Sequence, residues 1–195
     1  MNKKILLLLV TLLGVVSVHA REVAGVHIDE AATLQGVPET LQLNGAAIRT
    51  KLFFKIYVAA LYVTEKSNNA DSLLASTSAK RMLMYMLYDE VEKEKLTRAW
   101  TEGFDKNLSA ADYIAMKPRL MRFNDMFSTL HKNDIVQIDY VPGSGTRVTI
   151  RGEGGLYEEK GVIEGADFYR AVLRVWIGKE PATEDMKEGL LGEGD

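Results

Sequence analysis

The chain has no cysteine, only three histidines and only four prolines in 195 residues. Without cysteine it forms no disulfide, and it has no thiolate to act as a nucleophile or metal ligand. Outside the first twenty residues only His27 and His131 remain, and neither has a second ligand at metal-binding spacing. No nucleophile-elbow sequence supports a Ser-His-Asp triad. The glycine-rich stretches at 143–146 and 152–155 lack a following Lys-Ser/Thr helix start, so they are expected to be turns. The sequence therefore predicts no metal and no cofactor.

An excess of positive charge is also missing, because the formal net charge is -3. A mildly acidic chain gives no reason to expect a nucleic-acid partner. After residue 20 no apolar run approaches the roughly 20 residues that a helix needs to span a bilayer. We therefore expect no stable membrane span in the rest of the chain. Nothing in the sequence identifies a protein partner.

The first twenty residues have the layout of a secretory signal peptide. Lys3 and Lys4 form a basic start, residues 5–16 an apolar core, and Val18-His19-Ala20 a small-residue cleavage site. A retained membrane anchor is the alternative, but the apolar core is short for a span. We expect cleavage after Ala20 and export across the inner membrane into the periplasm. One domain of residues 21–195 would remain, and it is long enough to bury a sizeable core.

The hydrophobic periodicity separates strands from helices along the chain. Helices are expected from residue 92, from Ser109 and over 165–178, with Gly178 as the C-cap, and a helical turn over 71–76. Pro118 should bend or split the second helix. Segment 184–192 is expected to be a short helix or a docking strap. Strands are expected over 23–28, 39–44, 47–63 (one bent or two paired), 81–89, 134–142, 146–152 and 155–163. This order predicts an α+β fold, a large antiparallel sheet with helices packed on one face.

Arg49 interrupts an apolar stretch, LNGAAIRTKLFFKIYVAALYV at 43–63. A strand arginine is most often solvated, and that interpretation stays open. The alternative is the charged end of an apolar pocket. A guanidinium stays charged at any biological pH and holds a carboxylate or enolate through two parallel hydrogen bonds. A neighbouring tyrosine hydroxyl would add a donor, and apolar walls would strengthen both by excluding water.

Four separated blocks resemble the chalcone isomerase-like family, in its bacterial exported branch. They are NGAAIRTK (44–51), KIYVAALYV (55–63), DIVQIDYVPGSGT (134–146) and DFYRAVLRVWIG (167–178) with its trailing LLG (190–192). The resemblance covers nearly all of 21–195. It implies an open-faced β-sandwich, with a ligand cleft between a large antiparallel sheet and helices on one side.

The family includes plant enzymes that cyclise chalcones and non-catalytic members that bind fatty acids. The resemblance implies that Arg49 holds an anion in either case. A threonine that orders a catalytic water in the enzymes aligns with Tyr57. The fatty-acid binders are similar to this chain, with an arginine and a tyrosine on the carboxylate. A catalytic tyrosine and asparagine of the enzymes align with Leu96 and Gly103, which weakens the isomerase interpretation.

The spacing of Arg49 and Tyr57 sets a geometric condition. On one straight strand they would lie roughly 26 Å apart, at about 3.3 Å per residue. The chain must therefore fold back near residues 51–54, although TKLFFK contains no common turn residue. Tyr85 or Tyr88 is the alternative source of the hydroxyl. Candidate wall residues, for most of which core packing is the more common role, are Phe53, Met84, Met86, Trp100, Phe104, Phe123 and Phe127.

The sequence thus supports three hypotheses. The first is periplasmic binding of a small amphipathic carboxylate such as a fatty acid, anchored by Arg49. The second is an intramolecular lyase or isomerase in which Arg49 stabilises an anionic intermediate. The third is a non-catalytic envelope protein that binds a partner and whose cleft is filled.

Overall fold

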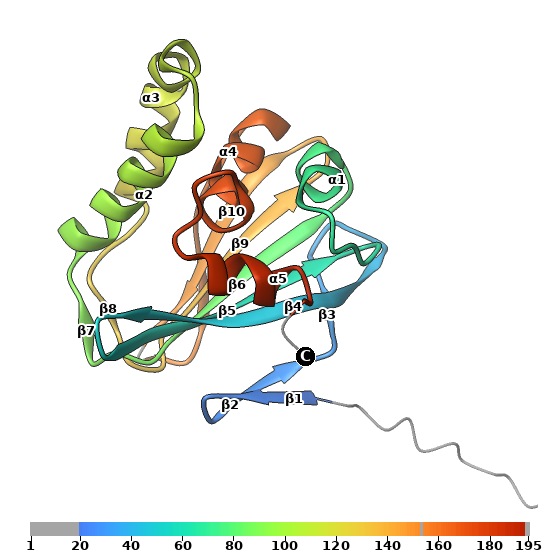
Figure 1. Ribbon diagram of the computed structural model, residues 1–195, viewed down its shortest axis with the longest axis vertical. Helices are drawn as coiled ribbons and strands as arrows, with labels where there is room; N and C mark the ends of the chain where they lie inside the picture. Colours follow the sequence, from blue (N-terminus) through green and yellow to red (C-terminus); the bar gives the residue numbers. More distant parts are fainter. Residues whose placement is uncertain (1–19, 153, 194–195) are drawn as a thin grey trace, which may run out of the picture.

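A curled sheet of seven strands forms the frame of the molecule (Figure 1). The computed structural model describes residues 20–152 and 154–193, so the predicted signal peptide lies outside them apart from Ala20. Every neighbouring pair of strands is antiparallel. The strand order is β11 (Tyr157–Ile163), β10 (Gly145–Arg151), β9 (Ile135–Val141), β6 (Lys80–Met86), β5 (Phe54–Val63), β4 (Thr40–Lys51) and β3 (Ala31–Thr33).

The helices cover one face of this sheet, which confirms the predicted α+β fold (Figure 1). They are α1 (Ala70–Ala75), α2 (Lys93–Asn107), α3 (Ala110–Asp125), α4 (Ala166–Ile177) and α5 (Glu184–Leu190). Most of α4 is buried, including Phe168, Val172 and Trp176. Its apolar stripe therefore joins the helices to the sheet in one core. Pro118 lies inside α3, which continues to Asp125, so the predicted split does not occur. Among the described residues, no helix has the length and apolar character to cross a bilayer.

The opposite face of the sheet carries a second, smaller core. It is covered by a hairpin of β1 (Ala20–Val23) and β2 (Val26–Asp29), drawn on the far side of the sheet from α4 and α5 (Figure 1). A single strand over 23–28 was therefore the wrong prediction. Ala24 and Gly25 both have positive φ, at 53° and 79°, and they turn the chain between two strands. A further small ladder joins β7 (Glu90–Val91) to β8 (Leu130–His131).

Segment 47–63 folds back on itself as two paired strands. Lys51 pairs with Phe54, so the turn consists of Leu52 and Phe53 alone, and Leu52 adopts a positive φ of 56°. The predicted separate strand at 39–44 is part of β4 instead. The register shifts twice along the hairpin, at Asn44 on β4 and at Ile56 on β5. These shifts are β-bulges, which re-aim the side chains that follow them.

The bulge at Asn44 is where the C-terminal segment docks. The Asn44 side-chain amide donates to the backbone oxygens of Leu190 (2.8 Å) and Ser67 (3.0 Å). At the next position, a Cβ on Gly45 would lie 2.1 Å from the Gly189 oxygen. Only glycine therefore admits so close an approach of α5 to β4. Segment 184–192 is both a short helix and a docking strap.

Candidate functional site

Arg49 and Tyr57 face each other across the β4–β5 hairpin. They are direct partners in the strand register. Without the bulge at Ile56 the regular pairing would have placed Ile56 opposite Arg49. The bulge therefore brings the tyrosine to the arginine, on the face that the helices cover. This is the fold-back that the spacing of the two residues demanded.

Both side chains line a small cavity between the sheet, α2 and α4. Its volume is about 130 Å³. The inner wall is mostly apolar, and a short loop at 180–182 closes the side next to α4. The lining residues are Arg49, Tyr57, Met84, Leu96, Ala99, Trp100, Glu102, Gly103, Lys106, Val175, Glu180, Pro181 and Ala182.

Two of the lining residues, Tyr57 and Trp100, carry a buried hydrogen-bond donor for which the described residues provide no acceptor. Trp176 Nε1 donates to the Tyr57 hydroxyl oxygen over 3.0 Å. The Tyr57 proton is thereby directed elsewhere, and no acceptor for it is recorded within the described residues. The indole N–H of Trp100 is fully buried and also has no acceptor among the residues described. A buried donor without an acceptor costs free energy, so a group that accepts hydrogen bonds would be stabilised next to these two residues.

The charges of the site point to the same kind of group. Arg49 is half-buried, and one guanidinium nitrogen donates to the Thr50 backbone oxygen over 2.9 Å. Burial raises the pKa of Tyr57 above its usual value, although the Trp176 hydrogen bond and the Arg49 charge lower it in part. Tyr57 therefore stays neutral and acts as a donor, not as a base. The two carboxylates, Glu102 and Glu180, lie exposed at the rim beside Lys106.

Some of the predicted site residues come together at this cavity. Besides Arg49 and Tyr57, the predicted walls Met84 and Trp100 line it. Leu96 and Gly103 line it too, so the two positions aligned with catalytic polar residues of the plant enzymes present no polar side chain here.

Other predicted residues do not reach the cavity. Phe53 is 92% exposed at the hairpin turn. Tyr85 points to the opposite face of the sheet, packs against the smaller core and donates to the Asn133 side chain over 3.2 Å. Tyr88 lies against Phe54, with ring centroids 5.4 Å apart. The remaining predicted walls are absent from the lining and pack in the main core instead: Met86, Phe104, Phe123 and Phe127.

The sequence did not single out Trp176 or the loop at 180–182. Trp176 belongs to the apolar stripe of α4, where an aromatic residue is ordinarily core. It is completely buried, and only its ring nitrogen shows a polar role. Asn107 fixes the loop to the end of α2, because its side chain exchanges two hydrogen bonds with the Glu180 backbone, at 2.7 and 3.0 Å. No local sequence motif predicts the hydrogen bond of Trp176 or those of Asn107.

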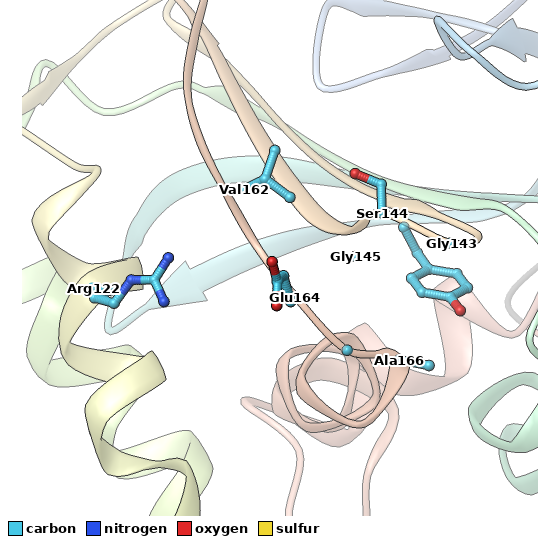
Figure 2. A pocket seen from close by; sticks show the side chains of 9 residues that line it. Arg122, Gly143, Ser144, Gly145, Val162, Glu164 and Ala166 are labelled. Atoms are coloured by element: carbon cyan, nitrogen blue, oxygen red, sulfur yellow. The ribbon is translucent and has the colours of Figure 1, made fainter.

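A larger hollow lies elsewhere on the surface, at the ends of β9, β10 and β11 (Figure 2). Its volume is about 630 Å³. Arg122 reaches into it from α3, Glu164 lies near its middle, and the turn at 143–145 bounds the far side (Figure 2). One arginine and one carboxylate line this hollow. The described residues contain no group of side chains that could hold a metal ion.

Comparisons with known proteins bear on the family and the fold. A search of curated protein sequences gives no match. Among solved structures, a fatty-acid binding protein of Arabidopsis thaliana has a similar fold, with a TM-score of 0.63 and 15% sequence identity. The alignment covers 83% of this chain and 96% of that one. The family model described as chalcone isomerase-like matches residues 20–192. The chain therefore belongs to the chalcone isomerase-like family.

Proposed function

We propose that this protein binds a small amphipathic carboxylic acid, such as a fatty acid, in the periplasm. The carboxylate would sit between Arg49 and Tyr57 in the cavity between the sheet and α2. The observation that carries this proposal is the set of donors on the lining residues. Arg49, Tyr57 and Trp100 line one small cavity, the buried indole N–H of Trp100 has no acceptor among the described residues, and the carboxylates of the cavity stay at the exposed rim.

A carboxylate fits this set because it accepts several hydrogen bonds and carries the opposite charge to Arg49. The apolar wall keeps water away, which strengthens each contact. Met84, Leu96 and Val175 would pack against the first carbons of the ligand. The similar fold of the Arabidopsis fatty-acid binding protein supports the same class of ligand.

The isomerase alternative receives less support from the cavity. The neutral Tyr57 cannot act as a general base, and Leu96 and Gly103 offer no proton donor or acceptor. Arg49 could still stabilise an anionic intermediate, but the inner wall provides no group to form one. Binding without turnover is the function that these residues support best.

The proposal is tested by calorimetric titration with dodecanoate of the mature protein, residues 21–195, after removal of lipid. Loss of charge-assisted hydrogen bonds in Arg49→Met should weaken binding by about 10- to 100-fold. Tyr57→Phe, which removes one hydroxyl, should weaken it by roughly fivefold.

Two matched controls separate the site from general damage. Arg122→Met removes the arginine of the other hollow, and Tyr62→Phe removes a buried hydroxyl from the opposite face, where Tyr62 donates to the Asp29 oxygen over 2.9 Å. Both should bind dodecanoate like the wild type. If the wild type does not bind, or if Arg122→Met is the variant that loses binding, the proposed site is wrong.

A further inference from the structure

The turn of the β4–β5 hairpin exposes an apolar surface flanked by lysines. Leu52 is 82% exposed, Phe53 92% and Phe54 52%. Lys51 and Lys55 border them on either side and are exposed as well. Tyr88 packs edge-on against Phe54, with ring centroids 5.4 Å apart. We call residues 51–55 with Tyr88 the hairpin tip.

The turn chemistry of the hairpin tip shows that its apolar residues are not there to form the turn. Two-residue hairpin turns favour Asn-Gly or Gly at positions of positive φ. Here Leu52 adopts φ of 56°, a conformation that side chains with a Cβ rarely take. Asparagine or glycine would relieve that strain and avoid exposing a large apolar side chain. Strain of this kind is commonly found at functional segments.

We propose that the hairpin tip inserts into the surface of an anionic lipid bilayer. Its apolar side chains would enter the boundary between headgroups and acyl chains, and Lys51 and Lys55 would contact lipid phosphates. Neither lysine makes an ion pair within the part of the chain that the structure describes. The acidic residues next to the tip, Asp89 and Glu90, follow Tyr88, and Glu90 faces His131 over 3.8 Å.

Two observations favour a bilayer over a second copy of the chain. A symmetric contact between two tips would bring four lysines together and repel. The hairpin tip also lies next to the candidate cavity, since Arg49 precedes Lys51 by two residues, or about 7 Å along the strand. Docking there would present the cavity to a membrane, from which an amphipathic acid can be drawn. The docking itself does not require that the proposed ligand be correct.

Vesicle binding and the depth of insertion test the proposal together. Phe53→Trp places a fluorophore on the hairpin tip, and Leu156→Trp places one on another exposed apolar residue, 83% exposed, as the matched control. Vesicles of phosphatidylcholine with 30% phosphatidylglycerol would be compared with phosphatidylcholine alone. We expect brominated acyl chains in the anionic vesicles to quench the emission of Phe53→Trp. The emission of Leu156→Trp should be quenched no more than that of the wild type, whose two native tryptophans are buried.

Two further variants separate the apolar and the electrostatic contributions. Leu52→Asn with Phe53→Ser removes both apolar side chains and places at position 52 a residue that tolerates positive φ, and it should weaken partitioning into anionic vesicles roughly tenfold. Lys51→Gln with Lys55→Gln should also weaken it roughly tenfold and reduce its salt dependence. Both variants should keep the wild-type dodecanoate affinity, and neither should have a melting temperature below that of the wild type. The proposal is overturned if Phe53→Trp and Leu156→Trp are quenched equally, or if the protein does not bind vesicles. It is also overturned if the wild type forms dimers that mutation of the hairpin tip abolishes.

Discussion

At the scale of single residues, Tyr57 owes its properties to neighbours from other elements. Trp176 on α4 occupies the hydroxyl oxygen of Tyr57, and Arg49 on β4 provides a positive charge opposite it. Burial keeps Tyr57 protonated. A tyrosine that already accepts a hydrogen bond can offer a ligand only its proton. Trp176 is therefore a positioning residue for the candidate site, because it acts only through its hydrogen bond to Tyr57.

The burial of Lys80 should make the free energy of unfolding depend on pH. It is only 2% exposed, and its ammonium donates to the backbone oxygens of Ser76 (2.7 Å) and Ser78 (3.0 Å). Burial, with a smaller contribution from the Arg170 charge, lowers the pKa of Lys80 to about 8. Between that pH and the ordinary value of 10.5, the unfolded chain holds a proton that the folded chain has released.

The free energy of unfolding should therefore gain a contribution from Lys80 as pH rises from about 8 to about 10.5. Below pH 8 both states are protonated, and this contribution is constant. Chemical denaturation of the wild type and Lys80→Met across pH 7 to 10.5 measures it. The difference in stability should move in favour of the wild type through that window. Parallel curves for the two proteins would show that Lys80 keeps an ordinary pKa.

At the scale of elements, the C-terminal strap depends on the close approach at Gly45. Gly45→Ala would put a Cβ 2.1 Å from the Gly189 oxygen and 2.7 Å from the Leu190 oxygen. Backbone atoms cannot yield as a flexible side chain does, so α5 must lift from β4. We expect a loss of roughly 1–3 kcal/mol or more in the free energy of unfolding. Limited proteolysis should then cut within segment 184–192 earlier than in the wild type.

Gly152→Ala is the control for that experiment. The nearest atom to its added Cβ would be an Asp134 carboxylate oxygen at 3.7 Å, an ordinary contact distance. This variant should unfold and resist protease like the wild type. If Gly45→Ala behaves the same way, the docking of α5 is looser than these contacts indicate.

The elements that the sequence predicted are those whose pattern is local. The apolar stripes of α2 and α4 and the alternation in β9 and β10 predicted their type and the α+β class. The errors fell where backbone geometry departs from residue preference. Ala24 turns the chain with positive φ between β1 and β2, where a single strand was predicted. Leu52 also has positive φ, but it lies in the fold-back near residues 51–54 that the spacing of Arg49 and Tyr57 did predict. Neither residue is a usual turn former, because its Cβ disfavours that conformation.

At the scale of the whole molecule, the candidate site combines residues from distant parts of the chain. Arg49 was predictable, because a charge inside an apolar strand needs a reason. Tyr57 was named as its partner only through the family resemblance, because the register that sets it opposite Arg49 depends on a bulge at Ile56 that no residue type predicts. The contribution of Trp176 depends on how α4 packs on the sheet. Such contacts form only when distant segments pack together, so a short window of sequence does not predict them.

The size of the cavity leads to a prediction about the motion of α2. About 130 Å³ holds a headgroup and a few carbons, whereas cavities for drug-sized ligands measure about 300–1,000 Å³. A fatty acid with a buried tail therefore requires more room. Figure 1 shows α2 and α3 standing at the edge of the sheet, and α2 packs against α4 through the contact of Gly103 with Val175. We expect α2 to move away from α4 when a long acyl chain enters.

Spin labels can measure this motion without background, because the chain has no native cysteine. Arg98→Cys on α2 with Glu158→Cys on β11 would report it, and Glu39→Cys with Glu158→Cys is a reference pair without α2; all three positions are exposed. Saturating dodecanoate should lengthen the first distance and leave the reference unchanged, while saturating butyrate should alter neither. If dodecanoate binds at Arg49 with no change in the α2 distance, its tail leaves the cavity past the rim instead of opening the fold.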